Sequence, residues 1–352
     1  MVIVAAVHTA AIGVSVVGAP IASAGAQSAP RVTELPTAAT ALLQAVHAVN
    51  PFVVWASGHK GMVVRSRDGG RSWERIEAPG GDSLEFRDVH AVSADTAWIL
   101  SAGSGAKSRI YRTTNGGATW RLQFLNPDSA AFYDCLSFGS ATTGVAYGDA
   151  SQQRTNLLRT DDAGRTWRLL APSAVPKPLP DEGAFAASGL CVVHGDANTV
   201  FVGTGSPGSR LFRSRDAGRT WTVENTPFSR GIASGLSGLS FADAQRGIAV
   251  AGDMNRLRTD SSSSVVGITT DGGRTWSMRP RPPRPGALAG VTWVPAAGPG
   301  VAVVVGFGGA FYTLDEGRSW LPITAEVTTG VSAVGRQVWI GGAGGKLWRV
   351  DF

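Results

Sequence analysis

Ser66-Arg67-Asp68-Gly69-Gly70-Arg71-Ser72-Trp73 is an eight-residue pattern that returns five more times along the chain. A Ser or Thr is followed two places on by Asp (Asn in one copy), four by Gly, six by Ser or Thr, and seven by Trp. A demanding β-hairpin turn needs a carboxylate to accept its hydrogen bonds, a glycine for positive φ and an indole packed beneath. We call this pattern the box and expect its third residues to be structural: Asp68, Asn115, Asp162, Asp216, Asp271 and Asp315.

The composition is typical of a turn-rich all-β protein. The 352 residues include 46 Gly, 19 Pro and 11 Trp, and only 16% are charged. The formal net charge of +6 is spread over the repeats rather than gathered into a run, so no nucleic-acid partner is expected. The repeats favour one domain over two.

Alignment on the boxes gives units of four strand-like segments, of which the first is 43–49, 52–56, 62–67 and 72–76. Six such units are complete, and a seventh begins at Val331 but ends one strand short at Phe352. An open blade would expose an edge. Arg31–Pro36 resembles the fourth strand of the sixth unit, so we predict a seven-bladed β-propeller over residues 31–352, closed by this N-terminal strand. Six blades with a ragged end is the alternative.

Residues 1–24 are predicted to be a signal peptide, followed by a linker over 25–30. The run is apolar and rich in small residues, and it ends in motifs that suit a signal peptidase, although no Lys or Arg follows Met1. The mature chain is therefore expected to be exported, periplasmic or secreted. An uncleaved membrane anchor is the alternative.

The two cysteines, Cys135 and Cys191, stand at equivalent places in the first strands of units three and four. Cysteines of an exported chain are more often paired than free, so a disulfide is predicted. Two buried thiols are the alternative.

The boxes resemble the Asp-box, or BNR, repeat. The whole of residues 31–352 resembles the BNR-repeat propellers related to the photosystem II stability/assembly factor, some bacterial members of which are labelled oxidoreductase or glycosyl hydrolase. The more specific pieces of the likeness are Phe132–Cys135, Tyr147–Asp149, Gly183–Gly189, Gly203–Gly205, Thr226–Pro227, Gly238–Gly247 and Gly252–Asp253. This resemblance implies a propeller that helps a membrane complex assemble, without catalysis.

A site is expected on the rim opposite the boxes, around the central channel, where residues depart from the repeat. Carboxylates and arginines gather in the connections there, and they either pair with one another, bind a ligand or catalyse a reaction. The candidate ligand-binding residues are Tyr133, Asp134, Asp149, Arg154, Glu182, Ser188, Arg210, Asp253 and Arg256.

The expected function is that of a monomeric, non-enzymatic propeller that binds a protein partner or a membrane complex. The alternative is a glycoside hydrolase, sialidase-like or xyloglucanase-like, that uses Asp134, Asp149, Glu182 or Asp253 on a glycan. The Arg-Ile-Pro element of sialidases is absent. No cofactor and no metal are expected, because the sequence has no phosphate loop and its histidines show no metal-ligand spacing.

Overall fold

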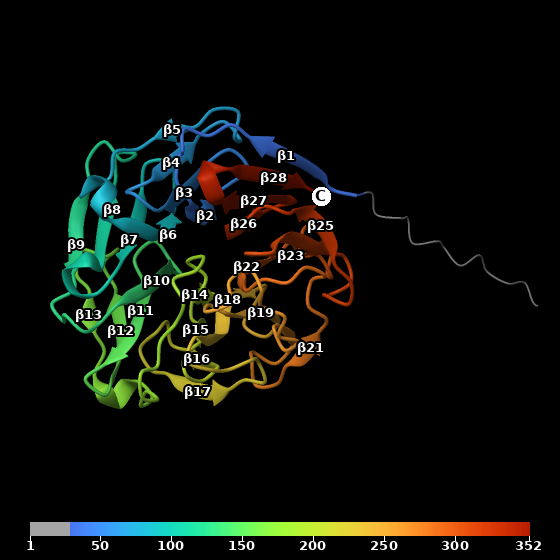
Figure 1. The fold of residues 1–352 in the computed structure, drawn as a ribbon. Coiled ribbons are helices and arrows are strands. Elements are labelled where there is room, and N and C mark those ends of the chain that lie inside the picture. Colours follow the sequence, from blue (N-terminus) through green and yellow to red (C-terminus); the bar gives the residue numbers. More distant parts are fainter. Residues whose placement is uncertain (1–28) are drawn as a thin grey trace, which may run out of the picture.

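The computed structural model describes residues 29–352; the predicted signal peptide and residues 25–28 of the predicted linker lie outside the described residues. Seven four-stranded antiparallel sheets stand around a common centre, as Figure 1 shows. This arrangement confirms the predicted seven-bladed propeller and excludes the six-bladed alternative. Nothing in the described part forms a helix long and apolar enough to cross a membrane.

In blades 1 to 6 the strands run in sequence order from the centre outward. Blades 1 to 3 are β2 (Leu43–Ala48), β3 (Val54–Gly58), β4 (Val63–Ser66) and β5 (Glu74–Arg75); β6 (Glu85–Ala91), β7 (Ala97–Ala102), β8 (Arg109–Thr113) and β9 (Arg121–Leu125); β10 (Tyr133–Phe138), β11 (Gly144–Ser151), β12 (Arg154–Thr160) and β13 (Arg168–Leu169). Blades 4 to 6 are β14 (Val192–His194), β15 (Val200–Thr204), β16 (Arg210–Ser214) and β17 (Thr222–Asn225); β18 (Ser234–Phe241), β19 (Gly247–Asp253), β20 (Val266–Thr269) and β21 (Ser277–Arg279); β22 (Leu288–Trp293), β23 (Ala302–Gly306), β24 (Gly309–Thr313) and β25 (Leu321–Thr324). Short 3₁₀ turns are η1 (Gly81–Ser83), η2 (Gly105–Lys107), η3 (Pro172–Ala174) and η4 (Ala343–Gly345).

Blade 7 combines the two ends of the described chain. Its strands β26 (Thr328–Val334), β27 (Gln337–Gly342) and β28 (Leu347–Asp351) are completed by β1 (Arg31–Leu35), which is antiparallel to β28. Val32 lies opposite Val350 in this pairing. The N-terminal strand therefore closes the ring, as the sequence predicts.

The boxes lie between the third and fourth strands and form one hydrogen-bonding scheme. In blade 1 the Ser66 hydroxyl donates to Asp68 and accepts from the Gly70 N–H at 2.8 Å. Asp68 accepts in turn from the Ser72 N–H at 2.9 Å and from the Ser72 hydroxyl at 2.6 Å. The box tryptophan packs into the interface with the preceding blade, as Trp73 does on Trp339 at 6.2 Å between ring centroids. These bonds stay within the turn, so the box aspartates have a structural role.

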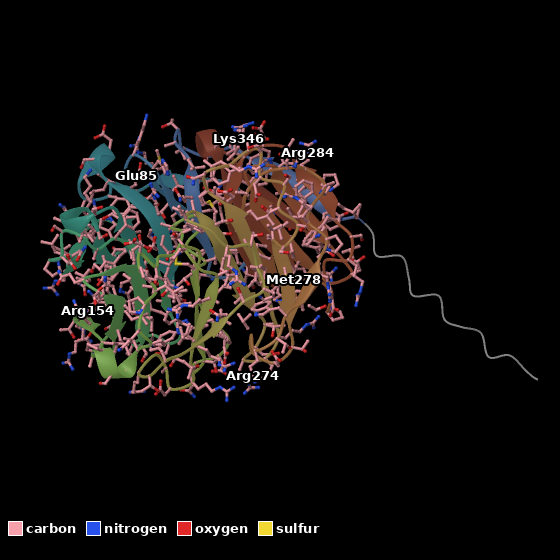
Figure 2. The ribbon with its side chains drawn as sticks, turned by 60° about the horizontal axis from the view of Figure 1, so that its bottom comes forward. Glu85, Arg154, Arg274, Met278, Arg284 and Lys346 are labelled. Atoms are coloured by element: carbon pink, nitrogen blue, oxygen red, sulfur yellow. A yellow bond between two sulfur atoms is a disulfide. The ribbon has the colours of Figure 1, made fainter. Side chains whose placement is uncertain are left out.

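The core lies between the blades, whereas charged side chains lie on the outside. Large side chains such as Trp55, Trp98 and Phe201 are completely buried. Arg274 and Lys346 project from the periphery in Figure 2. A disulfide joins Cys135 of β10 to Cys191, the residue directly before β14, with their Cα atoms 5.9 Å apart.

The innermost strands carry a β-bulge in every blade but the fourth. One residue of the innermost strand is skipped in the pairing, so it has no opposite residue on the second strand of the blade. A bulge of this kind re-aims a side chain. The skipped residues are Gln44, Arg87, Asp134, Ser237, Ala289 and Thr329.

Candidate functional site

Blade 4 has a short inner strand because the chain before β14 takes another path. Residues 183–190, which we call the plug, cross the central channel. The plug contacts blades 3, 1, 6 and 5 through four hydrogen bonds: Ala184 N–H to Asp149 Oδ1, Gln44 Nε2 to the Ala186 carbonyl, Ser188 Oγ to the Ala289 carbonyl, and Leu239 N–H to the Leu190 carbonyl. Contact with so many blades places the plug near the axis of the ring.

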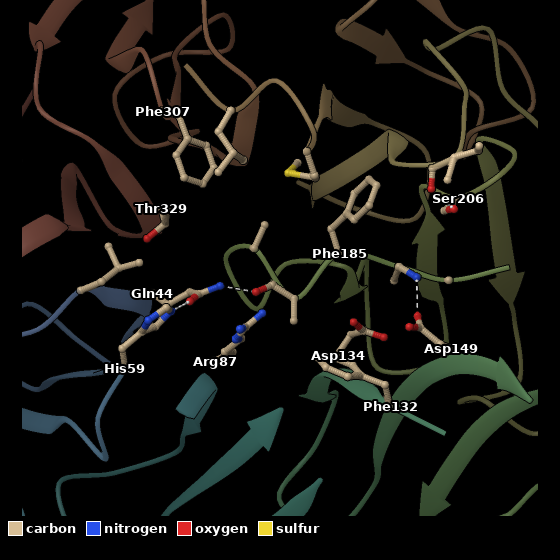
Figure 3. Close-up of a pocket in the computed structure, with 18 of the residues that line it drawn as sticks. Gln44, His59, Arg87, Phe132, Asp134, Asp149, Phe185, Ser206, Phe307 and Thr329 are labelled. Atoms are coloured by element: carbon tan, nitrogen blue, oxygen red, sulfur yellow. Dashed lines mark hydrogen bonds between the residues drawn. The ribbon is translucent and has the colours of Figure 1, made fainter. Parts of the chain in front are cut away.

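Above the plug, on the rim opposite the boxes, lies a cavity of about 530 Å³ that we call the mouth cavity. Residues 183–187 of the plug form part of its wall. Four of the bulge residues also line it, so the bulges supply side chains to this site: Gln44, Arg87, Asp134 and Thr329. Figure 3 shows them around the plug residue Phe185.

Two carboxyl groups of blade 3, Asp134 and Asp149, lie together in this cavity. Asp134 is 1% exposed, and burial followed by the charge of Asp149 raises its pKa well above the ordinary value. Burial raises the pKa of Asp149 to about 6. Because the two carboxyls interact, their titrations belong to the pair rather than to either residue alone. The Ala186 N–H also bonds to Asp134, so both carboxyls hold backbone amides of the plug.

The positively charged group nearest to this pair already has a partner. The Arg87 guanidinium bonds Glu85 through its Nε at 3.0 Å and its Nη2 at 2.5 Å. His59 contacts Gln44 Oε1 through Nε2 at 2.6 Å and lies 3.5 Å from Glu85 through Nδ1. Burial lowers the pKa of His59 despite Glu85. Neither Arg87 nor His59 therefore forms an ion pair with Asp134 or Asp149.

The other side of the mouth is apolar. Ile232 is 86% exposed and Leu257 is 38% exposed, and both line the cavity with Met254. Phe307 faces Asp134 and Asp149 across the cavity in Figure 3. Exposed apolar side chains gathered around a hollow are typical of a binding surface.

The remaining predicted site residues lie elsewhere. Glu182 is fully buried and paired through both carboxylate oxygens with Arg210, and it also accepts from the Thr204 hydroxyl. Tyr133 is buried against Phe124, with ring centroids 5.1 Å apart. The others lie outside the mouth cavity: Arg154 at the start of β12, Ser188 on the far side of the plug, Asp253 in a neighbouring hollow that shares Ile232, and Arg256 on the exposed segment after β19.

Below the plug is a second cavity of about 290 Å³, lined by Asp88, His47 and His90 among others. Burial raises the pKa of Asp88 well above its ordinary value and lowers the pKa of His47 to about 4. The rings of His47 and His90 are 4.3 Å apart, and burial lowers the pKa of His90 as well. Burial therefore disfavours the charged form of all three groups. Asp88 was not among the predicted site residues, although it directly follows the bulge residue Arg87.

The described residues include no group of three or more His, Cys, Asp or Glu side chains placed to hold a metal ion. No protein-family model matches the chain, and no curated protein matches its sequence.

Solved structures resemble the chain in fold. YCF48 bound to D1 peptide has a TM-score of 0.65 and 17% identity, and the match covers 92% of this chain and 97% of that one. A catalytically inactive virginiamycin B lyase from Staphylococcus aureus with quinupristin has a TM-score of 0.67 and 16% identity over 92% and 99%. The GH74 enzyme from Niastella koreensis has a TM-score of 0.57 and 14% identity over 86% of this chain and 51% of that one. Identities this low establish the propeller fold that the chain shares with these proteins, and nothing more.

Proposed function

We propose that the chain is an exported, non-enzymatic propeller of the BNR-repeat class, which binds a segment of a partner protein in its mouth cavity. In this role it assists the assembly of an envelope or membrane complex. The observation that carries the proposal is the mouth itself. A hollow of about 530 Å³ combines exposed apolar side chains such as Ile232 with a buried pair of aspartates.

Protein segments suit such a surface because they present apolar and polar groups together. A propeller of similar fold, YCF48, has been solved bound to a D1 peptide, which supports peptide binding as a use of this architecture. The boxes contribute only to stability in this proposal, because their hydrogen bonds are satisfied within the turn.

The geometry favours binding over glycoside hydrolysis. The carboxyl pairs of most glycosidases stand about 5 to 9.5 Å apart. Asp134 and Asp149 instead interact directly within the cavity, and Asp149 also accepts the Ala184 N–H of the plug. Glu182 is engaged by Arg210 and is not exposed.

Site-specific photo-cross-linking tests this proposal. A benzophenone amino acid is placed at Ile232, on the mouth, or at Leu122, on the outer strand β9, where the side chain is 47% exposed. Irradiation of the cells that make the protein should join one partner to the chain from position 232 and not from position 122. Equal cross-linking from both positions, or cleavage of chromogenic glycosides by the purified chain, would contradict the proposal.

A further inference from the structure

The buried carboxyl of Asp134 is not fully satisfied by hydrogen bonds. The side chain is 1% exposed, lines the mouth cavity and points into it in Figure 3. Its Oδ2 atom has no hydrogen-bonding partner among the described residues. A buried polar atom without a partner is costly, and native structures keep such atoms where a role requires them. The position follows from the bulge in β10, which turns this residue toward the channel.

Asp149 adds a second carboxyl beside Asp134. Its Oδ1 accepts the Ala184 N–H at 3.1 Å, which fixes the carboxyl against the plug. Two adjacent carboxyls repel each other when both are ionised, so a positive charge beside the pair is favourable. Burial raises the pKa of both side chains, in agreement with this arrangement.

Other charged side chains of this region have ion-pair partners. The buried Glu182 pairs with Arg210, and the partly exposed Arg87 pairs with Glu85. The carboxylates that line the mouth cavity are Asp134, Asp149 and Asp181, against the single guanidinium of Arg87. This excess of acidic side chains lies in a chain whose formal net charge is +6. The mouth is therefore an acidic site on a basic protein.

We propose that Asp134 and Asp149 form a subsite for one cationic group, the ammonium of a lysine or the guanidinium of an arginine in the bound segment. The N–H donors of such a group fit carboxylate oxygens, and its aliphatic stem packs on Leu257, Met254 and Phe307 across the cavity. Binding places the ligand's positive charge beside the two carboxyls and supplies a donor to the unpartnered Asp134 Oδ2. The inference rests on the proposed function and adds that the mouth cavity selects segments with a basic residue.

Selection from a displayed library of random decapeptides tests the subsite on the full chain. Enriched peptides should carry a Lys or Arg beside apolar residues. One enriched peptide is synthesised in two forms, with its basic residue and with an uncharged replacement, citrulline for arginine or norleucine for lysine. The uncharged form should bind the unaltered protein at least tenfold more weakly than the basic form. The double variant Asp134→Asn/Asp149→Asn should bind both peptides equally, whereas Ile232→Ser should weaken both by the same factor.

The outcomes separate the two proposals. The cation subsite is overturned if the enriched peptides lack a basic residue or are acidic, or if the unaltered protein binds both peptides equally. Segment binding then stays in place. If no peptide from the library binds in a way that Ile232→Ser weakens, both the cation subsite and segment binding at the mouth are overturned. The comparison of the two peptides on the unaltered protein decides the question even where the double variant fails to fold.

Discussion

The side-chain amide of Gln44, in blade 1, donates a hydrogen bond to the Ala186 carbonyl of the plug, 142 residues further along the chain. Gln44 is a bulge residue, so the same local irregularity that lines the mouth also fixes the segment that closes its floor. The plug thereby divides the channel into an upper cavity and a lower one.

Substitution of the plug residue Gly189 by Ala should destabilise the fold strongly. Its φ of +77° disfavours any side chain, and a Cβ would lie 2.3 Å from Asp88 Oδ1 in a buried place. Strain and overpacking together should cost about 3 kcal/mol. Gly335→Ala is the matched control, because its φ is +57° but nothing lies within 4 Å, and it should cost only about 1 kcal/mol. Urea unfolding measures both; equal losses would mean that the plug is not tightly packed.

The box should tolerate Asn but not Ala in place of its Asp. Blade 2 already carries Asn115, whose Oδ1 accepts the Thr119 N–H at 3.0 Å while its amide donates to the Thr119 hydroxyl at 2.9 Å. Asp271→Ala removes the acceptors of the Thr275 N–H and hydroxyl, and should cost roughly 1–3 kcal/mol. Asp271→Asn should cost less than half as much in the same urea measurement. Equal losses for the two variants would contradict the arrangement described for the turn.

The aspartates of the mouth and of the boxes should shift stability with pH in opposite directions. The pKa of Asp149 is raised to about 6, so its folded form holds a proton that the unfolded chain releases above about pH 4. Its contribution to stability therefore falls as pH rises from about 4 to about 6. The melting temperature of Asp149→Asn, relative to the unaltered protein, should rise over that range.

Asp68→Asn provides the contrasting variant. Hydrogen bonds from the Ser72 hydroxyl and N–H lower the pKa of Asp68 to about 2. The stability it contributes is present above about pH 4 and is lost as pH falls from about 4 to about 2. Its substitution should therefore matter most at neutral pH and least near pH 2. Parallel pH profiles for the two variants would show that the carboxyls do not differ as described.

Repetition made the architecture predictable, because the boxes mark the same turn six times and the missing strand of the seventh unit has one matching segment. The site was less predictable. Asp134 and Asp149, which the sequence singles out because they break the repeat, do line the mouth cavity. Glu182 and Arg210 are also predicted to bind a ligand, but they pair with each other, and a sequence does not show that two charges are partners. The path of the plug depends on contacts with other blades, which no local pattern encodes.

Loss of the closing strand should open the ring. β1 pairs with β28 over five residues, and the side chain of Leu35 packs against Gly70 of the first box, so β1 joins blade 7 to blade 1. A chain that begins at residue 37 would leave the ladder groups of β28 unpaired, at ~1 kcal/mol or more each. Against a total stability on the order of 10 kcal/mol, this loss is large. The shortened chain should therefore melt far lower or aggregate, as measured by calorimetry and light scattering. A chain that begins at residue 30 keeps β1 and should melt close to a chain that retains residues 25–29. If the chain that begins at residue 37 melts like the chain that begins at residue 30, β28 does not depend on β1 and the ring holds together without it.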